Sequence, residues 1–301
     1  MIKLYLIISI LLINTSVRSQ ERRVSITIDD LPGTDDSYEY IMNGLISFLS
    51  DNKIPTIGFV NEGKLYEDGK IKKERVHLLQ DWVAKDLDLG NHTFSHVFIN
   101  ETDVSAYKTD IIKGEKVIRS LMEAEQKELK YFRHPQLRTG PTDTYRLALE
   151  SFLEEQSYIT APVTIDNEEY IYAFCYKNAD EDLRVPIAQD YLRYMEEVII
   201  YYENLSLDYL GYELPQILLI HANELNADHI DKLANILKNR NYEFISLEEA
   251  LSDITYQLPT GTHQRGLSWI HRWMIENGLI PPIPPKISDF ILNIYQDYSS
   301  R

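Results

Sequence analysis

The chain contains two histidines, His92 and His96, that are separated by three residues within the segment 90–96. On a helical turn this spacing places both imidazoles on one face, close enough to share a metal ion. Neutral imidazole is the commonest protein ligand of zinc, and a catalytic zinc combines two or three N or O ligands with an open position. The pair alone is weak evidence, because the chain has eight histidines. A metal site therefore requires a third ligand and a base elsewhere in the sequence.

Candidates for these roles follow predicted strands. Apolar alternation or β-branched runs predict strands at 24–28, 55–60, 87–89, 130–132, 158–165, 216–220 and 244–245. Apolar residues at helical spacing predict helices at 38–49, 76–83, 107–121, 145–153, 192–202 and 230–237. This alternation is typical of βα units with a parallel sheet, and the strand count favours a barrel over an open sheet.

Seven polar side chains lie at or just after the ends of these strands: Asp29, Asp30, His92, His96, Arg133, Asp166 and His221. In a βα barrel the carboxyl ends of the strands form the face that carries the chemistry. Carboxylates and histidines with purely structural roles would be scattered instead. The coincidence is the strongest evidence for an active site that the residues themselves provide.

Composition excludes several classes of protein. The 301 residues are 44% hydrophobic and 26% charged, which is typical of a globular protein with a sizeable core. The formal net charge is −17 and no basic run is present, which argues against nucleic acid and anionic membrane surfaces as partners. Cys175 is the only cysteine, so no internal disulfide can form.

The N-terminal segment reads as a signal peptide. Lys3 is followed by an apolar run over 4–13 and by small residues up to Ser19. The alternative is a membrane anchor, but the run is too short to span a bilayer comfortably. We therefore expect cleavage before Gln20, no stable membrane span after processing, and export to a periplasmic or extracellular location, consistent with a bacterial protein.

Five segments, in order along the chain, resemble the motifs of polysaccharide deacetylases with the NodB homology domain, carbohydrate esterase family 4. They are residues 27–30 (Thr-Ile-Asp-Asp), 90–96 (Gly-Asn-His-Thr-Phe-Ser-His), 132–135 (Phe-Arg-His-Pro), 166–170 (Asp-Asn-Glu-Glu-Tyr) and 219–221 (Leu-Ile-His). The resemblance implies an α/β fold of the distorted (β/α)7-barrel type. The resemblance covers the chain from about residue 24 to 250. Together with the composition of the two ends, it divides the chain into a signal peptide (1–19), a NodB-type domain (20–254) and a C-terminal tail with a proline-rich linker and a helix (255–301).

The resemblance also implies roles for the candidate residues. Asp30, His92 and His96 would hold a divalent metal, zinc in the first instance and cobalt or another divalent ion as alternatives. Asp29 would be the general base, with Arg133 keeping it ionised, and His221 the general acid. Asp166 or Glu169 would orient His221, and Asp166 is preferred because a strand end fixes it better.

The implied reaction is hydrolysis of a carbon–nitrogen bond that removes the N-acetyl group from an amino-sugar polysaccharide or oligosaccharide. The alternatives are an O-acetyl xylan or glycan esterase, a small-amide hydrolase, and a non-catalytic glycan-binding protein, which would have a broken site. Leu31 stands where the family has Gly, and Glu169-Tyr170 where it has Asp-Trp, which leaves substrate preference open. The sequence leaves the oligomeric state and any chemical role of the tail open.

Overall fold

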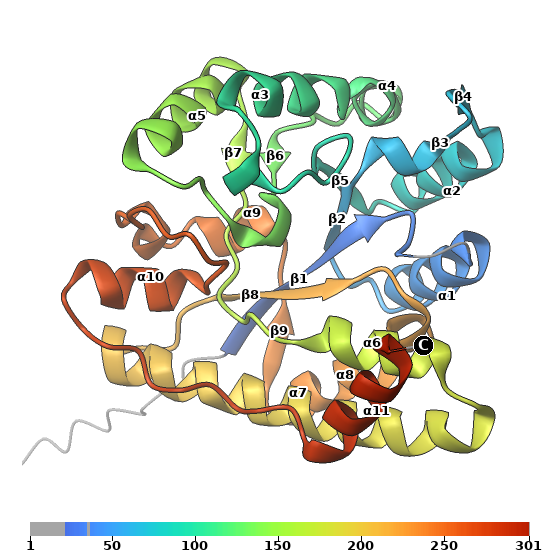
Figure 1. Ribbon diagram of the computed structural model, residues 1–301, viewed down its shortest axis with the longest axis vertical. Coiled ribbons are helices and arrows are strands. Elements are labelled where there is room, and N and C mark those ends of the chain that lie inside the picture. Colours follow the sequence, from blue (N-terminus) through green and yellow to red (C-terminus); the bar gives the residue numbers. More distant parts are fainter. Residues whose placement is uncertain (1–21, 35–36, 301) are drawn as a thin grey trace, which may run out of the picture.

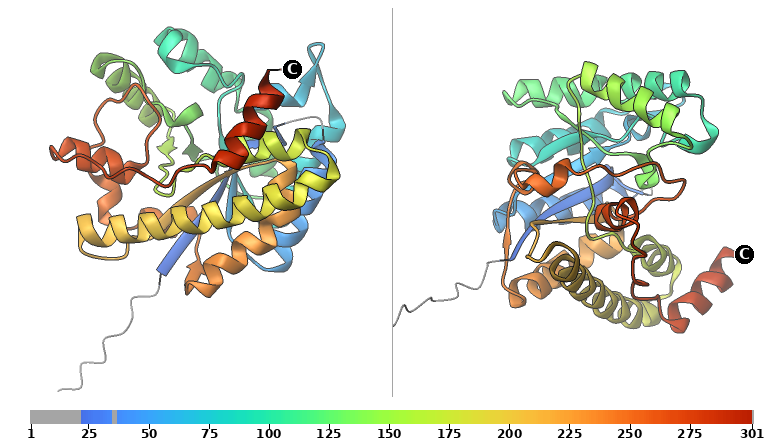
Figure 2. Two further views of the ribbon diagram at one scale, coloured as in Figure 1. Left: turned by 60° about the horizontal axis from the view of Figure 1, so that its bottom comes forward. Right: turned by 90° about the vertical axis from the view of Figure 1, so that its left-hand side faces the viewer.

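The structure is a computed structural model that describes residues 22–34 and 37–300 (Figures 1 and 2), so the expected signal segment lies outside the described residues. Seven strands form the main sheet: β1 (Arg22–Leu31), β2 (Thr56–Val60), β5 (Asp88–Asn91), β6 (Tyr131–Phe132), β7 (Ile159–Thr160), β8 (Gln216–His221) and β9 (Tyr242–Phe244). A separate antiparallel hairpin contains β3 (Tyr66–Glu67) and β4 (Lys70–Ile71).

Eleven α-helices are found within the described residues. They are α1 (Tyr38–Asp51), α2 (Lys73–Ala84), α3 (Val104–Lys113), α4 (Lys116–Ala124), α5 (Asp143–Glu155), α6 (Glu169–Asn178), α7 (Glu181–Leu210), α8 (Glu224–Asn239), α9 (Leu247–Leu251), α10 (Trp269–Glu276) and α11 (Asp289–Ser299). Figure 1 shows helices surrounding a central group of strands.

All pairs of the main sheet are parallel, in the order β7-β6-β5-β2-β1-β8, with β9 beside the start of β1. The sheet curls, and Ile165, beyond the end of β7, makes a parallel bridge to Leu218 of β8. This bridge brings the two edges of the sheet together. The predicted class, an α/β barrel built from βα units, is therefore confirmed.

Strand β1 runs through the core. Val24, Ile26 and Ile28 are fully buried, and so are the intervening Ser25 and Thr27. Burial on both faces is typical of a parallel strand that is covered on each side. The β1 strand pairs with β2 on one side and with β8 on the other, which fixes the position of the carboxylates at its end.

Two predicted elements differ from the observed ones. The single helix expected at 107–121 is two helices, α3 and α4, with a break at Gly114. A Cβ at Gly114 would lie only 2.5 Å from the backbone of Thr93 and Phe94, so glycine permits the histidine segment to approach the helix break. The strand expected at 158–165 is regular only over β7, and α6 forms where no helix was predicted.

The C-terminal residues lie against the barrel. Trp269 and Trp273 of α10 are buried, and the Trp269 amide donates to the Val163 carbonyl at 2.8 Å. The following proline-rich segment passes α7, where the Tyr201 hydroxyl donates to the Pro282 carbonyl, and α11 then packs beside α6 (Figures 1 and 2). In the part of the chain that the structure describes, no helix combines the length and apolar character needed to cross a membrane.

Candidate metal centre and active site

The end of β1 supplies two adjacent carboxylates to one cavity. Neighbouring residues of a regular strand point to opposite faces, but the register with β2 shifts between Ile28 and Leu31, and Asp30 has a φ of 70°. Asp29 is paired with His221 in the register between β1 and β8. This local irregularity allows both Asp29 and Asp30 to line the cavity that also contains His221.

The histidine segment after β5 is a loop, so the two imidazoles are not brought together by a helical turn. Thr93 and His96 both have positive φ values, 66° and 51°. The Thr93 amide donates to Asn91 Oδ1 at 2.8 Å, and the His96 amide donates to Thr93 Oγ1 at 3.0 Å. These bonds fold the loop back on itself and bring the two imidazole rings within 5.0 Å of each other, centroid to centroid.

Asp30, His92 and His96 form a compact set of ligand atoms. Asp30 Oδ1 lies 3.8 Å from His92 Nε2 and 3.7 Å from His96 Nε2, and one ligand atom of each residue lies within 4.8 Å of the others. Asp30 Oδ1 is buried and has no hydrogen-bond partner among the described residues. Two imidazoles and a carboxylate with an unsatisfied buried oxygen fit a divalent cation.

The protonation states of two of these residues suit a cation. His92 Nδ1 lies 2.8 Å from the Arg133 carbonyl, so Nδ1–H donates there and Nε2 presents its lone pair to the site. Burial and the neighbouring His96 hold the pKa of His92 well below its usual value, which keeps the imidazole neutral. Burial opposes ionisation of Asp30, but Lys64 and the histidines outweigh it and lower the pKa of this carboxyl.

Lys64 is a site residue that sequence reasoning missed. It lies in a 3-10 turn after β2 (Glu62–Leu65), and its Nζ is 3.5 Å from Asp30 Oδ1. The same ammonium donates to the Asp30 backbone carbonyl at 3.1 Å. A single lysine in a turn carries no sequence signal for this role, because only the pairing of β1 with β2 brings it to Asp30.

Asp29 lies beside the ligand set, as a base must. Its Oδ2 is 3.6 Å from His92 Nε2, and its Oδ1 is 3.5 Å from Arg133 Nη1. Burial raises the pKa of Asp29, while the charges of Arg133 and His221 act in the opposite direction. Arg133 is itself fully buried and donates to Thr27 Oγ1 at 3.0 Å. The structure thus places the side chains of Asp29 and Arg133 next to each other.

His221 is oriented by Glu169, so the preference for Asp166 is wrong. His221 Nδ1 lies 2.8 Å from Glu169 Oε2, and the side chain of Glu169 is buried. Glu169 begins α6, and its longer side chain reaches back to the end of β8. Asp166 lines the same cavity but accepts the Asn167 amide at 3.0 Å, and burial followed by the charge of Glu168 raises its pKa to about 6.

The charge of Glu169 governs the protonation of His221. Burial lowers the pKa of this histidine, but the hydrogen bond and negative charge of Glu169, with smaller contributions from Asp30 and Asp29, raise it to about 9. His221 is therefore protonated at neutral pH. Because Nδ1 faces Glu169, Nε2–H is the proton available to the cavity.

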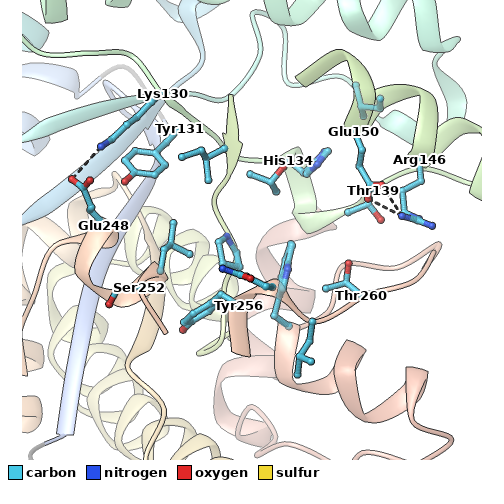
Figure 3. A pocket seen from close by; sticks show the side chains of 18 residues that line it. Lys130, Tyr131, His134, Thr139, Arg146, Glu150, Glu248, Ser252, Tyr256 and Thr260 are labelled. Carbon is cyan, nitrogen blue, oxygen red and sulfur yellow. Dashed lines mark hydrogen bonds and ion pairs between the residues drawn. The ribbon is translucent and has the colours of Figure 1, made fainter. Parts of the chain in front are cut away.

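These groups share one cavity of about 610 Å³, a size that suits a small ligand or one or two sugar residues. Its walls include Tyr170 and Phe174 of α6 and Arg265 and Gly266 of the tail. A second cavity, of about 580 Å³, is lined by His134, Tyr131, Arg146, Glu248 and Trp269 among others (Figure 3). None of the seven sequence-predicted site residues lines the second cavity.

Comparison with known proteins adds a family and a fold. Residues 16–152 match the family described as polysaccharide deacetylase. A search of the curated proteins found no match to this sequence. Of the solved structures, a polysaccharide deacetylase from Bacillus cereus is 17% identical over 75% of this chain and 91% of its own, with a TM-score of 0.53. This likeness confirms the NodB-type barrel.

A second similar structure is a carbohydrate esterase family 4 pseudoenzyme from Bacillus anthracis. It is 15% identical over 77% of this chain and 66% of its own, with a TM-score of 0.52. This chain therefore spans about two thirds of the pseudoenzyme's length. Since proteins with this fold include a pseudoenzyme, the fold alone does not show catalysis, which depends on the site residues.

Proposed function

We propose that this chain, of which residues 16–152 match the polysaccharide deacetylase family, is a metal-dependent hydrolase that removes N-acetyl groups from an amino-sugar polysaccharide or oligosaccharide. One observation carries the proposal. Three ligand residues, a buried carboxylate beside them and a protonated histidine all line a single cavity: Asp30, His92, His96, Asp29 and His221. A non-catalytic glycan-binding protein would have no reason to retain this complete set.

The ligand set of Asp30, His92 and His96 would hold the cation. When bound, a divalent cation supplies a Lewis acid that polarises the acetyl carbonyl and acidifies water. The donor set of two imidazoles and one carboxylate favours zinc, and cobalt is the closest alternative.

The chain's own residues supply the proton transfers. Asp29 accepts a proton from water as the water oxygen forms a bond to the acetyl carbon, and its raised pKa makes it a stronger base than an exposed aspartate. Arg133 balances the buried charge of Asp29 before the transfer. His221 Nε2–H then protonates the sugar nitrogen as the C–N bond breaks, so that acetate and a free amine leave.

The proposal is tested by incubating the protein, loaded with zinc or cobalt, with a panel of N-acetylated and O-acetylated oligosaccharides and measuring released acetate. We expect release from N-acetylated substrates, and loss of both metal and activity in His92→Ala and His96→Ala. Release of acetate from O-acetylated substrates alone would show that the protein is an esterase and not an amidase. A metal-loaded wild-type protein that releases no acetate from the panel would contradict the hydrolase itself.

We also propose that the protein acts outside the cytoplasm, after removal of residues 1–19. The support is the basic start at Lys3 and the apolar run up to Ile13. N-terminal sequencing of protein recovered from the periplasm or medium should give Gln20 as the first residue. Recovery of the intact Met1 terminus there would show an anchor instead.

A further inference from the structure

His96 is the ligand that the barrel holds least firmly. Its side chain is 32% exposed, whereas that of His92 is 2% exposed and bonded to the Arg133 carbonyl. Besides Asp30, the His96 ring contacts Gln136, whose side-chain amide nitrogen lies 3.1 Å from Nδ1. If Nε2 binds the cation, Nδ1–H must donate, and a rotated Gln136 amide offers its oxygen to that proton.

Gln136 belongs to a strained turn. Gln136 and Leu137 both have left-handed backbones, with φ values of 51° and 54°, a conformation that residues other than glycine adopt at a cost. Such a turn persists only where its surroundings determine it. Its surroundings here are the tail, which reaches the turn from more than 120 residues further along the chain.

The tail holds the turn at three points, which we call the tail clamp: Gln264, Gly266 and Arg272. The Gln264 carbonyl accepts a hydrogen bond from Arg138 Nη1 and another from Asn100 Nδ2, the latter at 2.8 Å. A Cβ at Gly266 would lie 2.1 Å from the Gln136 carbonyl oxygen, so only glycine fits against the turn.

Arg272 is the third point of the tail clamp. It is fully buried, and its guanidinium donates to the Leu137 carbonyl and, at 3.3 Å, to Thr139 Oγ1. The guanidinium also lies over the Trp269 ring, 4.6 Å from its centroid. A buried arginine whose planar group reaches both a backbone carbonyl and a hydroxyl of one turn is well suited to fixing that turn.

The tail clamp is itself fixed to the barrel. Ser268 Oγ donates to the Thr164 carbonyl at 2.6 Å, and the adjacent Trp269 amide donates to Val163. These contacts lie at the point where the segment after β7 meets β8. The tail therefore connects the closure of the barrel to the turn that contacts His96.

We propose that residues 264–272 support the metal centre, because the tail clamp fixes the turn at 136–139 and, through Gln136, the orientation of the His96 imidazole. This inference rests on the proposed function, since it assigns the tail a role in cation affinity. Gln136 and the clamp are positioning residues that contact neither the cation nor the reacting atoms. The tail, to which the sequence assigned no chemical role, then stabilises the position of a metal ligand.

The test measures zinc affinity by titrating the metal-free protein in the presence of a competing chelator. The variants are Gly266→Ala, which forces the tail off the turn, Gln136→Ala, which removes the contact to His96, and the double variant. We expect each single variant to bind zinc about 10-fold more weakly, the lower end of the usual effect of losing a partner of a metal-bound histidine. The double variant should bind zinc no more weakly than the single variant with the lower affinity, because both substitutions act through the contact between Gln136 and His96.

Gly278→Ala is the matched control in the same tail. Gly278 has a φ of 73° and no neighbour within 4 Å of an added Cβ, so alanine strains the tail without reaching the turn. It should lower the melting temperature and leave zinc affinity unchanged. Arg272→Lys is a second variant in case Gly266→Ala fails to fold. It keeps the buried positive charge but cannot reach both the Leu137 carbonyl and Thr139 Oγ1, so it should weaken zinc binding.

Two outcomes would overturn the inference while leaving the proposed function intact. One is wild-type zinc affinity in a folded Gly266→Ala or Arg272→Lys protein. The other is a double variant whose loss is the product of the two single losses. A wild-type protein that binds no zinc would instead overturn both the inference and the proposed metal centre.

Discussion

Glu169 Oε2 lies 2.8 Å from His221 Nδ1, although the two residues begin and end different elements, α6 and β8. The other oxygen of Glu169 accepts from the side-chain amides of Asn223 and Asn226, the latter at 2.6 Å. These donors hold the carboxylate in one orientation. The protonation of the proposed general acid is therefore set by a buried, fully partnered glutamate.

The pH dependence of turnover follows from this pair. The acid must be protonated, and the pKa of about 9 for His221 means that the proton is present at neutral pH and lost as the pH rises through 9. In Glu169→Gln the negative charge that raises the pKa is gone, while burial still lowers it. We expect the alkaline limb of the kcat profile to move to lower pH, with turnover at pH 8 reduced more than turnover at pH 6.

Asp166→Asn is the matched comparison for that experiment. Asp166 lines the same cavity, but its carboxylate accepts a hydrogen bond from the Asn167 amide, whereas His221 is bonded to Glu169. We expect its alkaline limb to stay close to that of the wild type. A shift in Asp166→Asn together with an unmoved Glu169→Gln would return the orienting role to Asp166.

Substitutions of the two adjacent carboxylates, Asp29 and Asp30, should have different effects on zinc content and turnover. Asp30→Asn replaces a charged ligand with a weak, neutral one, so zinc content and turnover should both fall. Asp29→Asn keeps the volume and all three ligands, so zinc should remain while kcat falls by roughly 10²–10⁴-fold, the usual contribution of a general base. Elemental analysis and steady-state kinetics on both proteins, with the exposed Asp81→Asn as a control, measure the two losses. An Asp29→Asn protein without zinc would reverse the assignment.

Lys64 should weaken the binding of a cation. Its ammonium lies 3.5 Å from Asp30 Oδ1, so it competes with a cation for the same oxygen. Lys64→Met removes this charge, and we expect zinc affinity to rise by roughly 10-fold, a modest value because Lys64 is partly exposed and solvent screens it. Chelator competition measures the change, and Lys72→Met, which removes a partly exposed lysine paired with Glu67, is the control. Weaker binding in Lys64→Met would show that Lys64 positions Asp30 instead.

The barrel could be predicted from the sequence because its signals are local. Buried runs such as 24–28 and 216–220 mark parallel strands by composition alone, and each polar residue that follows a strand end reaches the same face. For this reason the structure brings all seven polar residues together, six of them around one cavity and Arg133 against Asp29. The family resemblance then assigned their proposed roles.

The features that were missed depend on contacts between distant segments. Lys64 becomes a site residue through the pairing of β1 with β2, and Gln136 through a turn that the tail holds. Glu169 was a candidate, but the helix that directs it to His221 starts at Glu169 itself, within a segment without a clear apolar period. The break at Gly114 follows from the approach of the histidine loop, which helical spacing alone does not reveal.

The central position of β1 has a consequence for folding kinetics. This strand lies near the start of the described chain, yet its partners β8 and β9 end at residues 221 and 244. Pairings of such long sequence separation close large loops and form slowly. The strand that carries Asp29 and Asp30 should therefore be among the last to acquire its full set of hydrogen bonds. Pulsed hydrogen exchange during refolding should show late protection of the β1 amides, after those of α1 and α2, and early protection of β1 would contradict this order.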